Sequence, residues 1–459
     1  MYRFVPGRIR DYAVNAIARY FDFDTLGTNF RTESVAGLTT FLSMAYILFV
    51  NPSVLSLASA GPEAEALGMP REAVFTATAL AAAFGSLVMG LLARFPIAQA
   101  PGMGLNAFFA FSVVLGMGID WQTALAGTFV SGLIFVALSL SRIRQRIIDA
   151  VAPELKHAVA AGIGLFIAFI GLQNAGIVLD DDALLVRLAP LTTPETLLAI
   201  FGLAVTLVLM TLRLTSAIFL GMVATATAGI VTGLIELPNH IVGQVPDVTP
   251  VAGVALTRLD ELFTANMLVV IATMLFVDFF DSAGTLMGVA RQAGLIRDNR
   301  LPRAGRALFA DALATTASGL IGTSSTTAYI ESASGVAAGG RSGFTAVVVG
   351  VLFLLALFFS PLLAVVTSAV TAPALIVVGV LMCASLKQID WERFETAAPA
   401  FVTVLMMPLT YSIATGIALG FIVYPLTMAA AGRARDINPL MYALAVIFLG
   451  YFVFLRPAG

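Results

Sequence analysis

Charged residues are scarce in this sequence. Asp, Glu, Lys and Arg together make up 11% of its 459 residues, whereas hydrophobic residues make up 59%. Because soluble proteins are about 25% charged, this chain has too few charges to cover a water-soluble globule of its size. The formal net charge of −2 carries no information about partners, and we expect no nucleic-acid partner.

Cysteine and histidine are nearly absent. The single cysteine, Cys383, lies in an apolar run and can form no intrachain disulfide, and the two histidines, His157 and His240, lie at the ends of apolar segments. The sequence has no His/Cys metal-ligand spacing, no phosphate-binding loop and no serine-triad motif. We therefore expect no metal, no cofactor and no enzymatic activity. Residues 1–33 contain no long apolar core, so we expect no cleavable signal peptide.

Long apolar runs are abundant. Charge-free stretches of 18 or more residues recur from Ser34 to Phe452. Since a helix needs about 20 residues to cross about 30 Å of hydrocarbon, these runs predict an all-α polytopic membrane protein with about fourteen transmembrane segments. The predicted spans are 34–57, 72–94, 101–117, 121–140, 157–178, 194–212, 214–235, 266–290, 307–321, 326–338, 344–368, 371–386, 398–409 and 411–431. The further apolar segment 440–455 remains open as a span.

The charges between the spans predict the orientation of the chain. Lys and Arg gather in alternate loops, above all at 142–156 and 291–306. The opposite loops hold acidic residues at 63–65, 180–182 and 247–261. Because cytoplasmic loops are enriched in Lys and Arg, we expect a cytoplasmic N-terminus. We expect the lipid bilayer that surrounds the chain to be the cell membrane, here a bacterial inner or plasma membrane.

The longest connection, residues 236–265, divides the chain into two sets of seven spans. An odd number of spans per half gives the two halves opposite orientations in the membrane. Weak internal similarity agrees with this, because Leu-Phe-Val-Asn at 48–51 resembles Leu-Phe-Val-Asp at 275–278. An inverted repeat of this kind is typical of secondary transporters.

Two spans in equivalent positions of the halves are short and interrupted. Span 3 begins with 99–107, which contains Gly102 and Gly104. Span 10 begins with 322–332, which contains the polar run 323–327. Non-helical backbone at membrane depth must be buried in protein or line a wet cavity, so we expect two extended strands that each lead into a half-helix. Such paired breaks indicate a substrate site, whereas tight helix packing through small residues is the alternative.

Carboxyl groups inside the predicted spans are few. Asp278 and Asp281 share a face near the middle of span 8, Asp311 lies in span 9, and Glu331 follows the polar run of span 10. Charges at membrane depth mark functional sites, and burial disfavours the ionised form, so we expect one of these carboxyl groups to hold a coupling proton. For Asp281 an equal alternative is a role in fixing the strand backbone, and for Asp311 a structural role is favoured.

Two asparagines and several aromatic residues accompany these carboxyl groups. Asn106 follows the glycine-rich turn of span 3 and can donate and accept hydrogen bonds, so we expect it to contact a ligand or to cap its half-helix. Asn51, which precedes Pro52, is expected to break the helix of span 1 and to support the site. The aromatic residues either stack on a flat ligand or pack in the core. They are Phe108, Phe109, Phe279, Phe280 and Tyr329.

Five motifs along the chain, taken in order, are typical of a known family. They are NFRTESVAGLTTF at 29–41, AYILFVNP at 45–52, PGMGLNAFF at 101–109, DFFDSAGT at 278–285 and GTSSTTAYIESASG at 322–335. Together they resemble the azaguanine-type branch of the nucleobase–ascorbate transporter (nucleobase:cation symporter-2) superfamily, the adenine/guanine/hypoxanthine permeases. The resemblance extends from about residue 23 to about residue 452.

The resemblance implies a fold of fourteen spans in a 7+7 inverted repeat, with a core domain, a gate domain and short strands in spans 3 and 10. It also implies proton symport, with Na⁺ as the alternative coupling ion, an elevator-like movement of the core against the gate, and a homodimer. The implied boundaries are 1–33 for the cytoplasmic N-terminus, 34–140 and 266–368 for the core, 157–235 and 371–431 for the gate, 236–265 for an extracytoplasmic connection and 432–459 for a C-terminal segment.

The implied function is import of purine nucleobases, namely guanine, hypoxanthine and/or adenine. Asp278 and Glu331 would hydrogen-bond the purine, and Asn106 would support binding. The implied ligand-binding residues are Asp278, Glu331, Asn106, Gly102, Gly104, Thr326, Thr327, Ala328 and Tyr329, and the proton-coupling or site-supporting residues are Asp281, Asp278, Glu331 and Asn51. The alternatives are a transporter of the same fold for uracil, xanthine or an inorganic or organic anion, and a channel.

Overall fold

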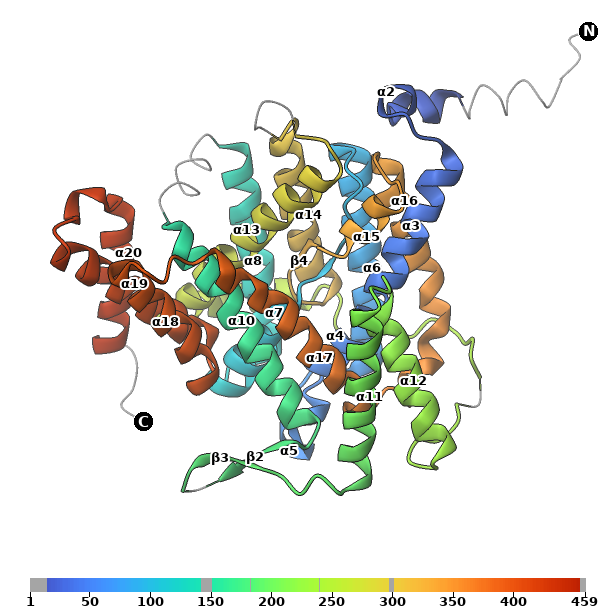
Figure 1. Ribbon diagram of the computed structural model, residues 1–459, viewed down its shortest axis with the longest axis horizontal. Coiled ribbons are helices and arrows are strands. Elements are labelled where there is room, and N and C mark those ends of the chain that lie inside the picture. The colour runs from blue at the N-terminus through green and yellow to red at the C-terminus, as the bar shows by residue number, and fades with distance from the viewer. Residues whose placement is uncertain (1–14, 142–150, 182, 239, 297–300, 455–459) are drawn as a thin grey trace, which may run out of the picture.

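The computed structural model describes residues 15–141, 151–181, 183–238, 240–296 and 301–454. Residues 142–150 and 297–300 of the two predicted basic loops, the acidic residue 182 and the N-terminal residues 1–14 lie outside these ranges. Within the described ranges, nine helices are long and apolar enough to cross a membrane. The long helices run between an edge that carries α2 (Phe23–Leu26) and an edge that carries the hairpin of β2 (Val178–Asp181) and β3 (Leu185–Leu188) (Figure 1).

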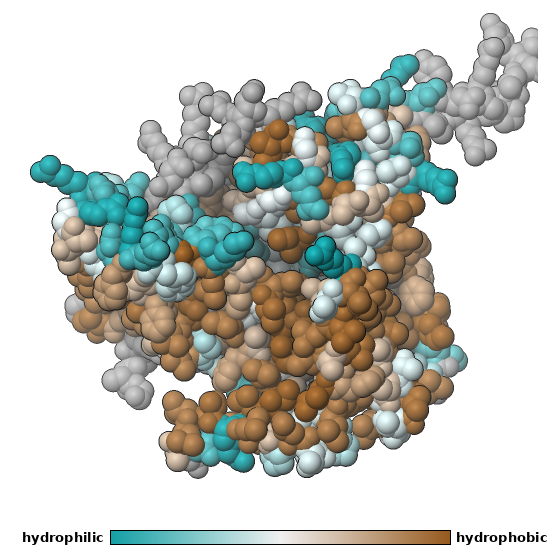
Figure 2. Space-filling model, in the orientation of Figure 1, coloured by the Kyte–Doolittle hydropathy of each residue, from teal (hydrophilic) through white to brown (hydrophobic). Residues whose placement is uncertain are grey.

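The surface agrees with a protein embedded in a bilayer. Figure 2 shows apolar side chains in a broad band across the molecule, with hydrophilic side chains gathered mainly along the edge that carries α2. Large apolar residues such as Val223, Leu268 and Val351 are about half exposed. Exposed apolar surface on this scale is stable in hydrocarbon and unfavourable in water. The chain is therefore a multi-pass membrane protein.

The first half of the repeat contains seven spans. Span 1 is α3 (Phe30–Met44) and α4 (Ile47–Leu55), span 2 is α6 (Arg71–Val88) with η2 (Met89–Ala93), span 3 is β1 (Gln99–Pro101), α7 (Met103–Ala107) and η3 (Phe108–Gly116), span 4 is α8 (Trp121–Leu140), span 5 is α10 (Pro153–Asn174), span 6 is α11 (Pro194–Thr211), and span 7 is α12 (Ala217–Val231). The short elements η1 (Ala58–Ala60) and α5 (Pro62–Glu65) connect spans 1 and 2.

The second half repeats this arrangement. Its spans are α13 (Ala265–Gln292), α14 (Ala304–Ile321), β4 (Thr326–Ala328) with α15 (Ser332–Ala337), α16 (Gly343–Ala356) with η5 (Leu357–Val365), α17 (Ser368–Cys383) with η6 (Ala384–Gln388), α18 (Phe394–Leu409) and α19 (Ile413–Ala430). The helix η4 (Val254–Leu262) lies in the connection between the halves, and η7 (Ala434–Asp436) follows span 14. Each half thus has its broken span in third place.

The last helix, α20 (Pro439–Phe454), covers the segment that the sequence left open. It packs against α19, and Phe448 makes an edge contact with Phe421. Its 16 residues extend about 24 Å at 1.5 Å per residue. The spans α12 and α18, with 15 and 16 residues, are no longer than this. The length of α20 therefore does not distinguish it from a span, and α20 is a further helix that packs against α19.

Span 1 changes from α3 to α4 at Ala45 and Tyr46. Asn51 and Pro52 lie inside α4, so the predicted helix break at Asn51 is wrong. Proline has no N–H group and crowds the carbonyl four residues earlier, which here is that of Leu48. The chain accommodates this in the preceding turn, where two backbone hydrogen bonds reach three residues back instead of four.

The strands predicted in spans 3 and 10 are present and pair with each other. They form an antiparallel two-stranded sheet in which Gln99 faces Ala328, Ala100 faces Thr327 and Pro101 faces Thr326. All six residues are buried. The backbone groups of the two broken spans therefore satisfy one another, which is the requirement for non-helical chain at membrane depth.

The helices contact one another in two sets. Helices of spans 1–4 pack against those of spans 8–11, as α6 and α3 do with α16, and α8 does with α14. Helices of spans 5–7 pack against those of spans 12–14, as α10 does with α17 and α18, and α11 does with α17. Fewer contacts join the two sets, including those of α7 with α10 and of α4 with α17. We keep the names core and gate for these two sets of spans, and the domain boundaries remain predictions.

Candidate functional site

The centre of the candidate site is the β1–β4 pair and the short helix that follows each strand. Beyond the ladder, Gly102 N donates to Ser325 O at 2.9 Å and Tyr329 N donates to Ala98 O at 3.0 Å. The chain then enters α7 at Met103 and α15 at Ser332. Both helices therefore begin beside the sheet, where their first N–H groups lack intrahelical partners.

Two carboxyl groups lie beneath the sheet and are inaccessible. Asp278 is 1% exposed and Asp311 is 0% exposed. Asp278 Oδ2 lies 2.6 Å from the hydroxyl of Thr315, which also lies 2.8 Å from the carbonyl oxygen of Thr326. Asp311 Oδ1 accepts a hydrogen bond of 2.6 Å from Gln99 Nε2. Among the described residues, Asp278 Oδ1 has no hydrogen-bond partner.

Two other carboxyl groups form an accessible layer next to these. Asp281 is exposed and Glu331 is half-buried, and the two are near enough for their charges to interact. Gly284 and Gly288 continue the exposed face of α13 below Asp281. Ile330, beside Glu331, is 60% exposed. The site therefore has a buried acidic layer and a more exposed acidic layer.

Amide side chains from the first half complete the polar groups. Asn106 is fully buried, and its Oδ1 accepts a hydrogen bond of 2.6 Å from the Ser324 hydroxyl. Its Nδ2 lies 3.9 Å from the sulfur of Met103, a weak contact. Asn51 Nδ2 lies within 2.7 Å of Thr78 Oγ1 and 2.9 Å of Thr323 Oγ1. Asn51 therefore joins span 1 to the segment that leads into β4, and ligand contact by Asn106 remains a prediction.

The predicted ligand residues of β4 are held by the protein itself. The Thr326 hydroxyl lies 2.6 Å from that of Ser318, and the Thr327 hydroxyl lies 2.6 Å from that of Ser282. Tyr329 donates from its hydroxyl to the carbonyl oxygen of Pro101 at 2.5 Å. Ala328 is buried. Their side chains fix the strand pair, and their contact with a ligand stays a prediction.

The two glycines predicted at the site mark close approaches. A Cβ atom on Gly102 would lie 2.6 Å from Thr327 Cγ2. A Cβ atom on Gly104 would lie 2.7 Å from Ile163 Cγ2, on α10 of the gate. The absence of a side chain at Gly104 therefore allows the span 3 half-helix to approach the gate closely.

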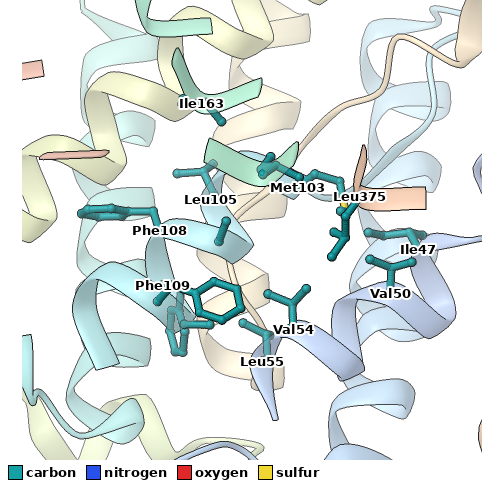
Figure 3. Packing of buried hydrophobic residues seen from close by; sticks show 14 of the residues in the cluster. Ile47, Val50, Val54, Leu55, Met103, Leu105, Phe108, Phe109, Ile163 and Leu375 are labelled. Atoms are coloured by element: carbon teal, nitrogen blue, oxygen red, sulfur yellow. The ribbon is translucent and has the colours of Figure 1, made fainter. Parts of the chain in front are cut away.

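The opposite side of α7 and η3 is apolar. Figure 3 shows Met103, Leu105 and Phe108 among side chains of α4, α10 and α17. Phe108 and Phe109 are at most 1% exposed and belong to this apolar cluster. Of the two fates expected for the aromatic residues, core packing applies to this pair. Phe279 is also buried, in edge contact with Phe135.

Three residues of the site were missed in the sequence. Tyr46 donates to Glu331 Oε1 at 2.6 Å across 285 positions, and Gln99 reaches Asp311 across 212. Thr315 contacts Asp278 from α14. Gln99 had a usable signal, because it is a large polar residue at the start of a buried strand. No three His, Cys, Asp or Glu side chains in the described ranges are placed to hold a metal ion.

The fold and the site together define a class of protein. Paired broken spans around a polar site, in equivalent positions of a 7+7 inverted repeat, are features of a secondary transporter. The chain belongs to the permease family, whose model matches residues 31–419. This confirms the family resemblance inferred from the five motifs and identifies the chain as a transporter rather than an enzyme.

Named relatives cover nearly the whole chain. The guanine/hypoxanthine permease PbuG of Bacillus subtilis is 60% identical over 437 residues, which are 95% of this chain and 99% of that protein. The adenine permease AdeQ of Escherichia coli is 43% identical over 442 residues, 95% of this chain and 97% of that protein.

Solved structures of other transporters share the fold. The transmembrane domain of the cyanobacterial bicarbonate transporter BicA matches with a TM-score of 0.59 at 15% identity, covering 85% of this chain and 97% of that one. The murine anion transporter Slc26a9 in the inward-facing state matches with a TM-score of 0.59 at 13% identity, covering 87% and 69%. At such low identity these matches establish the fold alone, and they confirm the predicted 7+7 architecture.

Proposed function

We propose that this protein imports purine nucleobases, namely guanine, hypoxanthine and/or adenine, by proton symport across the cell membrane. The observation that carries the proposal is the acidic site, in which Asp278 of α13 is linked to β4 through Thr315, and Glu331 directly precedes α15 of the broken span 10. The 60% identity to a guanine/hypoxanthine permease supports a purine as the substrate. The alternative is a transporter of the same fold for uracil, xanthine or an anion.

The charge of the site argues against an anionic substrate. Ionised carboxylates only accept hydrogen bonds, and like charges repel at short range. Asp281 and Glu331 form the accessible layer, so an anion would meet negative charge first. A purine presents N–H groups at its edge, which suit these acceptors. A bicarbonate-like or sulfate-like substrate is thereby disfavoured, although the fold is shared with anion transporters.

The contacts of Asp278 support a coupling proton. Thr315 has one hydroxyl hydrogen, and both Asp278 Oδ2 and the Thr326 carbonyl oxygen lie within hydrogen-bond distance. The carbonyl can only accept. A proton on Asp278 satisfies both contacts, because the carboxyl then donates to Thr315 and Thr315 donates to the carbonyl. If Asp278 is ionised, the single hydroxyl hydrogen of Thr315 can serve only one of these two contacts.

The proposed transport movement displaces the core against the gate in an elevator-like manner. The close approach of Gly104 to Ile163 supports this proposal, because no side chain at residue 104 obstructs sliding of the core helices past the gate helices. In this proposal the N-terminus is cytoplasmic, the protein works as a homodimer, and no cofactor is needed besides the coupling ion.

Uptake of labelled purine tests the proposal. Cells that lack their own purine permeases and express this protein should accumulate labelled hypoxanthine or guanine saturably, and a protonophore should abolish accumulation. Dependence on Na⁺ instead would contradict proton coupling. Saturable uptake of uracil or sulfate without purine uptake would replace the proposed substrate class, and single-channel currents in bilayers would indicate a channel.

A further inference from the structure

The residue that contacts the Glu331 side chain comes from the break in span 1. Tyr46 lies between α3 and α4 and is 1% exposed. Its hydroxyl donates to Glu331 Oε1 at 2.6 Å. Buried tyrosine hydroxyls need a hydrogen-bond partner, and this one uses a carboxyl oxygen of the half-buried glutamate. Span 1 thereby reaches a side chain of span 10.

Span 1 also contacts the segment that fixes the main chain at Glu331. Ser334 Oγ donates to the Glu331 carbonyl oxygen at 2.7 Å, and Ser43 Oγ lies 2.8 Å from Ser334 Oγ. Ser43 lies in the last turn of α3, three residues before Tyr46. The backbone and the side chain of Glu331 are thus fixed from one short segment, while the residue as a whole stays half-buried next to the exposed Ile330.

We propose that Tyr46 is a positioning residue that keeps Glu331 as an ionised hydrogen-bond acceptor, so that the site favours 6-oxopurines over adenine. This inference rests on the proposed function. A hydroxyl that donates to a carboxylate favours its charged form. Partial burial of Glu331 disfavours its charged form, and the hydrogen bond from the Tyr46 hydroxyl counters that penalty.

The consequence for selectivity follows from the edges of the bases. Guanine and hypoxanthine carry a hydrogen on N1, whereas adenine carries a lone pair there. An ionised carboxylate accepts from N1–H and faces the adenine lone pair with another acceptor. A neutral carboxylic acid has a hydrogen to donate and removes that penalty. The Tyr46 hydroxyl therefore biases the site toward purines with N1–H.

Transport competition in wild type and Tyr46→Phe tests the inference. In wild type, hypoxanthine should bind more tightly than adenine, measured as the KM of labelled hypoxanthine and the inhibition constant of adenine. In Tyr46→Phe the KM of hypoxanthine should rise about tenfold, the loss expected for one hydrogen bond to a charged group. The adenine constant should change less than about twofold, so the selectivity ratio falls about tenfold.

Tyr411→Phe is the matched control. Tyr411, between α18 and α19, also donates from its hydroxyl, at 2.7 Å to Gln173 Oε1 of α10, in a partly buried hydrogen bond. Its loss removes the same chemical group at a place without contact to Glu331. The selectivity ratio should stay at the wild-type value in Tyr411→Phe, and a fall equal to that in Tyr46→Phe would overturn the inference.

The remaining outcomes separate this inference from the proposed function. Wild type that transports purines but prefers adenine, or Tyr46→Phe with a lower maximal rate and an unchanged ratio, would overturn the role of Tyr46. Radioligand binding to purified Glu331→Gln should show no further loss of hypoxanthine affinity when Tyr46→Phe is added, and an additional loss would also overturn it. Wild type without any purine uptake would refute the proposed function instead.

Discussion

Spans 3 and 10 hold equivalent places in the two halves, yet their side chains differ in chemistry. After β1, the chain enters α7 and then η3, whose residues are buried in an apolar cluster. After β4, the chain passes the exposed Ile330 and the half-buried Glu331 before α15 begins. The backbone plan is shared, but the residues that follow β4 are more exposed than those that follow β1.

The carboxyl groups follow the same asymmetry. All four carboxyl groups of the site come from the second half, whereas the first half contributes neutral donors and acceptors. The acidic residues are Asp278, Asp281, Asp311 and Glu331, and the neutral ones are Tyr46, Gln99 and Asn106. The inverted repeat therefore supplies a symmetric backbone frame, and residues of the second half alone supply the carboxyl groups of the candidate site.

The largest effect should come from the acidic half. In Glu331→Gln, uptake of labelled hypoxanthine should fall by about 100-fold or more, because removing a charged hydrogen-bond partner costs several kcal/mol. Uptake is measured in cells with the membrane level of the protein quantified by immunoblot. Glu63→Gln, in the exposed helix α5, is the charge-matched control. Uptake by Glu331→Gln within twofold of wild type would remove the acidic site from the mechanism.

The neutral half should be less sensitive. Asn106→Ala should lower hypoxanthine uptake by about tenfold, the effect of one or two lost neutral hydrogen bonds. Ser324→Ala removes the donor to Asn106 Oδ1 and leaves the amide in place, so its effect should be smaller. An Asn106→Ala loss as large as that of Glu331→Gln would show that the two halves contribute equally and would break the comparison.

Substitution of a glycine in α15 should mainly affect stability, whereas substitution of a glycine in α7 should mainly affect uptake. A Cβ atom on Gly335 of α15 would lie 2.1 Å from Thr40 Oγ1 and 2.6 Å from the Ala36 carbonyl oxygen, within the core. Gly335→Ala should lower the midpoint of thermal unfolding of purified protein, since overpacking costs about 1–3 kcal/mol. The nearest atoms to a Cβ atom on Gly104 all belong to the Ile163 side chain and none to backbone, so Gly104→Ala should slow uptake with a smaller change in the midpoint. A larger fall of the unfolding midpoint in Gly104→Ala than in Gly335→Ala would contradict this expectation.

The smallest effect should come from charges outside the spans. Hydrogen bonds from Thr123 and Arg258 lower the pKa of Glu261 in η4. A carboxyl group with a lowered pKa stabilises the fold above its unfolded pKa of about 4.3, and this contribution is lost as the pH falls through the folded pKa. Arg258→Ala should therefore slightly lower the unfolding midpoint at pH 7 and leave it unchanged in acid. If Arg258→Ala lowered the unfolding midpoint more in acid than at pH 7, the result would contradict a lowered pKa of Glu261.

Local chain chemistry made the broken spans predictable. The Pro-Gly turn before Met103 and the hydroxyl run before Tyr329 are poor helix formers at membrane depth, and the structure pairs them as β1 and β4. The break in span 1 was misplaced, because proline acts on the turn before it. The register of the strand pair depends on contacts between the two halves, so no local sequence pattern predicts it.

The side-chain contacts of the site were less predictable. The spacing of Asp278 and Asp281 places them on one helix face, yet Asp278 is buried and Asp281 is exposed. Three helical residues turn the side chain by about 60°, enough to cross the edge of a packed face. The contact of Tyr46 with Glu331 joins residues 285 positions apart, which no periodicity in one sequence reveals.

Binding of labelled hypoxanthine to the purified protein is the most direct test of an acidic purine site. Wild type should bind hypoxanthine saturably, with competition by guanine and none by uracil or sulfate, and Glu331→Gln should bind it about 100-fold more weakly while keeping its thermal unfolding midpoint. Equal binding by wild type and Glu331→Gln, or competition by sulfate, would contradict the assignment of Glu331 and its acidic neighbours as the substrate site.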